Sequence, residues 1–104
     1  MDKLELAFTE ELKNRAYEAK KKYKYNPTRF LQMLAQYGGW DTAKRLIKDG
    51  EISDGFTRLL IEGRLDLTME AVVIEHRFND LFSDKEIQIC KDKLIASGYK
   101  KLKE

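Results

Sequence analysis

The sequence has little proline, cysteine, histidine or tryptophan, with one residue of each type among its 104 residues. The single cysteine, Cys90, cannot form an intramolecular disulfide, and this is typical of proteins in a reducing compartment. Structural zinc needs three or four Cys or His ligands, and Cys90 and His76 together supply only two. We therefore expect a cytoplasmic protein with no metal and no cofactor.

Long apolar runs are also absent. No run approaches the roughly 20 residues that a membrane helix needs. The first twelve residues, MDKLELAFTEEL, carry acids where a secretory signal would carry a basic segment and an apolar block. We therefore expect no membrane partner and no secretion.

The sequence lacks the usual catalytic motifs. It has no phosphate-binding loop and no Gly-x-Gly-x-x-Gly after a strand. The apolar neighbours Ile87 and Leu94 favour Cys90 as a buried hydrophobic residue and argue against a reactive thiolate paired with a histidine. We expect His76 at the surface or at a helix end, and we expect no enzymatic activity.

Apolar residues make up 42% of the chain and charged residues 37%, a composition typical of soluble globular proteins. The length suggests one domain. We place this single helical domain at residues 1–99 and expect residues 100–104 to form a frayed basic tail.

The pattern of caps, apolar spacings of three to four, and glycines predicts an all-α fold. We expect a compact single domain of about six short helices joined by tight turns that end in glycine. The second helix begins with Asn26 as N-cap and Pro27 as its first helical residue. The expected helices cover about residues 3–23, 26–38, 39–50, 53–63, 68–77 and 83–98, with a start after Thr9 as the alternative for the first helix.

The same spacings predict which side chains form the core. Val72, Val73 and Ile74 are poor helix formers, so tertiary packing must hold the helix that contains them. Trp40 is expected to anchor the core and not to stack on a base. The other expected core residues include Phe8, Leu12, Ala16, Ala19, Phe56, Leu59, Leu60, Leu94 and Ile95.

The charges are unevenly distributed. Residues 1–49 hold 11 basic and 7 acidic residues, residues 50–90 hold 4 and 9, and residues 91–104 hold 5 and 2. The segment YEAKKKYKYNPTRF, residues 17–30, has no acid after Glu18 and interleaves tyrosines with cations. Lysine and arginine neutralise phosphates, and tyrosine stacks on unpaired bases. The candidate nucleic-acid-binding residues are Lys20, Lys21, Lys22, Lys24, Arg29, Tyr23 and Tyr25.

The alternative for this segment is a solvated helix end. Lysines in a last helical turn favour the negative end of the helix dipole, and tyrosines cover the edge of a core. The sequence alone leaves both interpretations open.

The stretch QYGGWDTAKRLI, residues 36–47, partly resembles a helix-hairpin-helix element, whose glycine turn directs backbone N–H groups at a DNA phosphate. Gly39, Ala43, Leu46 and Ile47 match that pattern, but Tyr37 stands where the family has its first glycine. Gly38 and Gly39 therefore join the candidate nucleic-acid-binding residues. The alternative is a helix C-cap at Gly38 followed by a close helix crossing.

A protein interface is the second functional hypothesis. Eleven aromatic residues are many for a small helical domain to bury, and an exposed patch of them would serve a protein partner or a homodimer. Arg58 and Arg64 lie in the acidic middle of the chain, where we expect them to pair with Glu62, Asp66 or Glu70.

The blocks NPTRFLQMLAQYGGWDTAKRLI, SDGFTRLLIEGRLDLTMEAVVIE and LFSDKEIQICKDKLIASGY resemble a small all-helical domain of uncharacterised bacterial proteins. That domain stands alone or is attached to larger proteins, some of them restriction-type nucleases. The resemblance covers about residues 26–99. It implies a bacterial cytoplasmic accessory module and assigns no catalytic residue. Our leading hypothesis is a non-enzymatic module that binds DNA or RNA with little sequence preference.

Overall fold

The computed structural model describes residues 2–50 and 52–100, and within them it is all-helical. The expected tail at 100–104 lies outside the described residues from 101 onward. Helix α2 is broken at Gly38, so the five α-helices contain six helical segments and the predicted fold class is confirmed. The elements are α1 (Lys3–Tyr23), α2 (Thr28–Asp49), α3 (Asp54–Ile61), η1 (Leu65–Leu67), α4 (Met69–Val73), η2 (His76–Leu81) and α5 (Asp84–Ala96).

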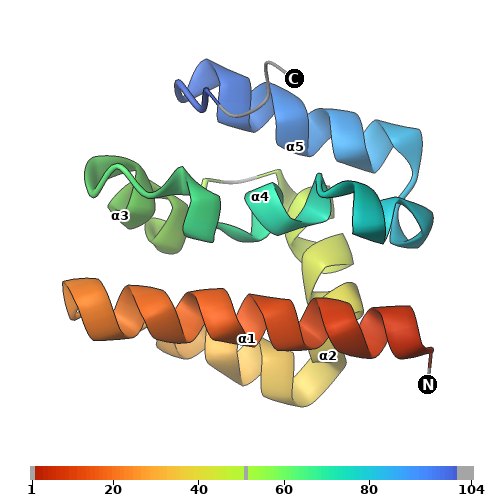
Figure 1. Cartoon of the computed structure of the whole chain (residues 1–104), viewed down its shortest axis with the longest axis horizontal. Helices are drawn as coiled ribbons and strands as arrows, with labels where there is room; N and C mark the ends of the chain where they lie inside the picture. The colour runs from red at the N-terminus through yellow and green to blue at the C-terminus, as the bar shows by residue number, and fades with distance from the viewer. Residues whose placement is uncertain (1, 51, 101–104) are drawn as a thin grey trace.

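The helices form three layers (Figure 1). Helix α1 and the first half of α2 make the lowest layer, α3, α4 and η2 make the middle layer, and α5 covers the top. The second half of α2 turns away from α1 at Gly38 and rises toward α5. The end of α1 and the start of α2 therefore lie on one side of the molecule, below α3.

The main core lies between the lower and middle layers. The Phe8 ring meets Phe78 and Phe82 edge to face, with ring centroids 5.1 and 5.2 Å apart. Val72 and Val73 are fully buried against this cluster. Their burial explains how α4 persists with only five residues, because contacts with other helices replace the helical propensity that its sequence lacks.

Side chains and glycines set most of the helix ends as the sequence predicts. The hydroxyls of Ser53, Thr68 and Ser83 each accept a hydrogen bond from the first turn of a helix, and Ser83 forms a complete capping box with Glu86. Gly50, Gly63 and Gly98 follow helices with positive φ, which glycine tolerates without steric cost.

Two predicted boundaries are wrong. Helix α2 begins at Thr28 with Pro27 as its N-cap, one residue later than expected, and no side chain caps it. The helix expected at 68–77 ends at Val73, because Glu75 adopts an extended backbone and a separate 3₁₀ helix starts at His76. A new helical segment after one extended residue is beyond what side-chain periodicity reveals.

Three residues expected in the core are exposed. Leu60 lies 40% exposed and Ile95 58%. Trp40 keeps 37% of its surface exposed because its indole N–H donates to the Leu81 carbonyl at 2.6 Å, which holds the ring at the edge of the core. Phe8, Leu12, Ala16, Ala19, Phe56, Leu59 and Leu94 are buried as expected.

Candidate nucleic-acid interface and the adjoining pocket

The cations of segment 17–30 point to solvent. Lys20 and Lys21 lie in the last turn of α1, and Lys24 follows that helix in a left-handed conformation with φ of 55°. Arg29 lies exposed in the first turn of α2. None of these four residues forms an ion pair with a described residue, whereas Lys22 contacts Glu18 at 3.1 Å. The structure thus places a group of unpaired positive charges around the connection between α1 and α2.

The tyrosines of this segment are not equivalent. Tyr17 is 55% exposed. Tyr23 is held within the fold, because its hydroxyl accepts from Arg64 at 3.0 Å and its carbonyl accepts from Arg58 at 2.8 Å. Tyr25 lies partly buried beside α3, and burial, followed by the nearby Asp54 carboxylate, raises the pKa of its phenol. Only Tyr17 therefore offers an open ring for stacking.

Arg58 and Arg64, in the acidic segment 50–90, connect α3 and η1 to the end of α1. Arg58 pairs with Glu62 at 3.0 Å, and Arg64 pairs with Asp66 at 2.9 Å, as the sequence predicts. Arg64 also reaches Glu18 of α1 at 2.9 Å. Glu70 instead pairs with Lys93 at 2.7 Å. The contacts with α1 could not be predicted from local sequence, since 46 residues separate Arg64 from Glu18.

Gly38 and Gly39 form a close helix crossing. Gly38 has φ of 79° and breaks α2. The buried Gly39 amide donates to Thr9 Oγ1 of α1 at 3.0 Å. A Cβ at Gly39 would lie 2.8 Å from Thr9 Cα, so only glycine fits there. Because the Gly39 amide is bonded and buried, this turn does not present it to a phosphate as a helix-hairpin-helix turn would.

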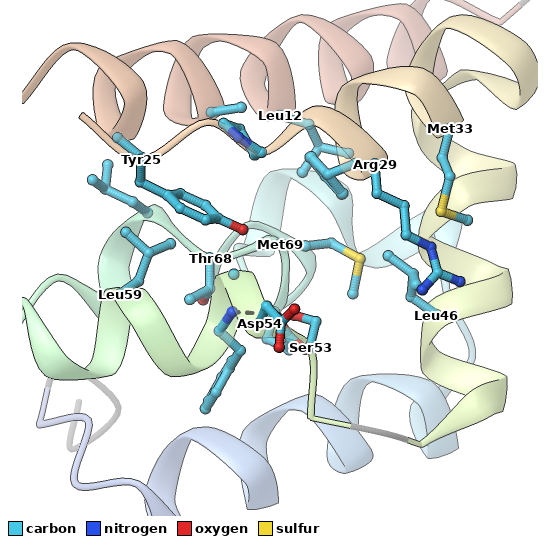
Figure 2. A pocket seen from close by; sticks show the side chains of 18 of the residues that line it. Leu12, Tyr25, Arg29, Met33, Leu46, Ser53, Asp54, Leu59, Thr68 and Met69 are labelled. Atoms are coloured by element: carbon cyan, nitrogen blue, oxygen red, sulfur yellow. Dashed lines mark hydrogen bonds between the residues drawn. The ribbon is translucent and has the colours of Figure 1, made fainter. Parts of the chain in front are cut away.

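A pocket of about 450 Å³ opens between α1, both ends of α2, the start of α3 and residues 67–70 of η1 and α4. Its walls are mainly apolar. Figure 2 shows the Tyr25 hydroxyl and the Met69 side chain pointing into this space, with Ser53 and Asp54 on the opposite side. Arg29 and Met33 extend from α2 at another edge. The volume falls in the range of about 300–1,000 Å³ typical of small-molecule sites.

This pocket was not expected from the sequence. Its only sequence signal is the pair of small residues Ala16 and Ala19 on the inward face of α1, with Gly55 at the start of α3. Small side chains on facing helices leave space between them, but the sequence does not show which helices face each other.

Cys90 and His76 lie in different environments. Cys90 is buried, and burial, followed by the nearby Glu70 carboxylate, raises the pKa of its thiol to about 12. His76 is exposed at the start of η2, where its Nδ1 lies 3.4 Å from the Asn79 amide. Across residues 2–50 and 52–100, no three His, Cys, Asp or Glu side chains gather closely enough to hold a metal ion.

No helix in the described part of the chain has the length and apolar character needed to cross a membrane. No protein-family model, curated protein or solved structure matches the sequence. The similarity to small bacterial helical domains therefore stays a prediction, and the case for a function depends on the geometry of this chain.

Proposed function

We propose that this protein is a non-enzymatic, cytoplasmic accessory module that binds nucleic acid through the connection between α1 and α2. One observation carries the proposal: Lys20, Lys21, Lys24 and Arg29 are all exposed, and none forms an ion pair with a described residue. Lys22 joins them, because its exposed pair with Glu18 is worth little and a phosphate can replace the carboxylate.

These lysine and arginine side chains contact the phosphates of a nucleic acid and not its bases. Binding through these cations is therefore sequence-tolerant and strongly dependent on salt. Glu62 and Asp66 do not cancel these charges, because they already pair with Arg58 and Arg64. The proposal leaves Gly38 and Gly39 out of the interface, since Gly39 holds α2 against α1.

Fluorescence anisotropy with labelled oligonucleotides over a series of salt concentrations tests the proposal. Replacing Lys20, Lys21, Lys22, Lys24 and Arg29 with Gln should abolish most binding at low salt. The slope of log K against log salt is negative, and each lost phosphate contact reduces its magnitude by about 0.7 for a single strand. The magnitude of the slope should therefore decrease by about 3 to 4 in this variant.

A matched control removes the same charge elsewhere. Lys3, Lys48, Lys85, Lys91 and Lys100 form no ion pair with described residues, and their replacement with Gln changes the net charge equally. If the two quintuple variants lose affinity to the same extent, net charge and not the α1–α2 connection explains binding. Absence of any binding by the wild type at low salt refutes the proposal.

A protein contact or homodimer is the second candidate. Trp40 favours it, because this large ring remains 37% exposed and lies beside Lys44, whose Nζ is 5.4 Å from the ring centroid. Light scattering over a concentration series tests self-association. Trp40→Ala should lower the measured mass if Trp40 lies in a dimer interface, whereas a strict monomer at all concentrations removes the homodimer from consideration.

A further inference from the structure

The pocket and the cationic segment are neighbours in the chain and in space. Lys24 directly precedes Tyr25, and residues 25–30 form one wall of the pocket. Ala16 and Ala19 of α1 line it as well, and Ala19 directly precedes Lys20 and Lys21. A ligand that contacts these cations from outside is therefore placed beside the opening.

The pocket itself does not suit an anion. Asp49, Asp54 and Glu70 line it, and Arg29 is the only cation among the lining residues that the structure describes. Lys93 neutralises Glu70 at 2.7 Å, which leaves two carboxylates against one guanidinium. A phosphate or fatty-acid carboxylate would be repelled from the interior, whereas a neutral group that donates hydrogen bonds would be attracted.

The lining combines surfaces for stacking with groups for hydrogen bonding. Phe30, Met33 and Met69 supply flat or adaptable apolar contacts. The Tyr25 hydroxyl and the Asp54 carboxylate make no hydrogen bond with described side chains or backbone, so both are open to a ligand. Thr68, in contrast, already donates to Leu65 and accepts from Ala71. Proteins hold an unstacked base by packing apolar side chains against its faces and by forming a few hydrogen bonds with its edge.

We propose that this pocket receives one unpaired base of a single-stranded nucleic acid, while the adjoining phosphates contact Lys20, Lys21 and Lys24. The inference rests on the proposed function and adds to it a preference for single strands over duplexes. Because Asp54 only accepts hydrogen bonds when ionised, it favours adenine or cytosine, whose exocyclic amino groups project two N–H donors, over uracil, whose single N3–H lies between two carbonyl oxygens that the carboxylate repels.

The two methionines of the pocket provide a direct probe. In protein labelled with ¹³C at the methionine methyl groups, a base that enters the pocket should shift the NMR signals of Met33 and Met69 through its ring current. The signals are assigned with Met33→Leu and Met69→Leu. Oligo(A) and oligo(C) should produce these shifts at low salt, a fully paired duplex should not, and oligo(U) should bind about tenfold more weakly.

Two variants separate the pocket from the cations. Ala16→Leu fills the pocket from α1 and should abolish the preference for single strands while leaving salt-dependent duplex binding. Asp54→Asn keeps the shape of the site but removes the acceptor charge, so affinity for oligo(U) should approach that for oligo(A). Circular dichroism establishes that each variant is folded, and the methyl shifts of the wild type test the inference even if one variant does not fold.

Several outcomes distinguish the two proposals. Binding that depends on the five cations, equal for single strands and duplexes and without methyl shifts, overturns the base pocket and supports the proposed function. Methyl shifts caused by adenosine monophosphate but by no oligonucleotide overturn the single-strand inference in favour of a free nucleotide. Loss of binding in the quintuple Gln variant, together with methyl shifts in the wild type, supports both.

Discussion

Thr9 and Gly39 hold the first two helices together. The Gly39 amide donates to Thr9 Oγ1 at 3.0 Å, and the same hydroxyl donates to the Glu5 carbonyl at 3.0 Å. A methyl group at Gly39 would meet Thr9 Oγ1 at 2.7 Å and Thr9 Cα at 2.8 Å, and the latter is a backbone atom that cannot rotate away. This crossing fixes the angle at which the second half of α2 leaves α1.

Gly39→Ala should destabilise the protein by about 1–3 kcal/mol, the usual cost of overpacking, despite the better helical propensity of alanine. Urea denaturation measures the change. Gly55→Ala is the matched comparison, because the nearest atom to a Cβ there is the Tyr25 hydroxyl, at 3.0 Å, at the end of a side chain and not in the backbone. It should alter stability by less than about 0.5 kcal/mol. Equal losses in both variants would contradict the close crossing.

Arg15 connects α1 to the middle layer. It donates to Glu11 at 2.8 Å, to the Asp66 carbonyl at 2.8 Å, and to Glu75. Although burial disfavours its charge, the hydrogen bonds that it donates to the Glu11 and Glu75 carboxylates raise the pKa of this guanidinium. Because the side chain is largely buried, Arg15→Ala should cost about 1.5–3 kcal/mol of stability.

Arg15→Lys should fall between the wild type and Arg15→Ala, since lysine keeps the charge but loses the planar fork. Arg45→Ala is the control, because Arg45 forms its ion pair with Asp41 at the surface. Its loss should cost less than about 1 kcal/mol in the same urea titration. A loss at Arg45 as large as that at Arg15 would contradict the role given to burial.

Glu86 should contribute to acid sensitivity. Burial raises the pKa of its carboxyl, but hydrogen bonds from Ser83 and Lys44 outweigh burial and lower this pKa below its ordinary 4.5. The pKa of Glu11 is lowered in the same way against burial, by Arg15 and Arg77. A lowered folded-state pKa means that the stabilisation is complete above pH about 4.5 and is lost as the pH falls through the folded-state value.

Glu86→Gln isolates this charge, since glutamine can keep the capping hydrogen bond to the Ser83 amide. The variant should be less stable than the wild type by about 1 kcal/mol near neutral pH, and the difference should shrink toward about pH 3. Thermal unfolding across this pH range measures it. A difference that stays constant with pH would show that shape, and not charge, is responsible.

Cys90 should react only when the protein opens. Burial raises the pKa of its thiol to about 12, so almost no thiolate exists near neutral pH. Labelling with a thiol reagent should be on the order of a hundredfold or more slower than in the urea-unfolded chain. The rate should increase with urea below the unfolding transition. Rapid labelling of the native protein would contradict the burial of this side chain.

Local features of the sequence predicted the helices well. Ser53, Thr68 and Ser83 act on amides three residues away, so their capping roles can be read directly from the chain. The apolar spacing in residues 3–23 predicts the full extent of α1 for the same reason. The helix end predicted at residue 77 is wrong, because one extended residue, Glu75, divides a segment whose apolar spacing is periodic. Apolar periodicity alone does not reveal such a break.

The candidate interface was only partly predictable. The cations at residues 20–29 could be named from the sequence, because consecutive lysines on a helix end have few neighbours that could bury them. The sequence could not show that Tyr23 packs within the fold, because its hydroxyl accepts a hydrogen bond from Arg64, which is 41 residues away. The pocket depends on several helices meeting at one place, and no local pattern records that arrangement.

The sequence by itself determined the helices and their ends, since capping, glycine conformation and apolar period act over three or four residues. The tertiary structure decided which charges remained free, which aromatic rings were covered and where a pocket opened. Arg15 illustrates the physical reason: its partners Asp66 and Glu75 lie 51 and 60 residues away. Such contacts form only when separate helices pack, and their strength comes from burial that the packing itself creates.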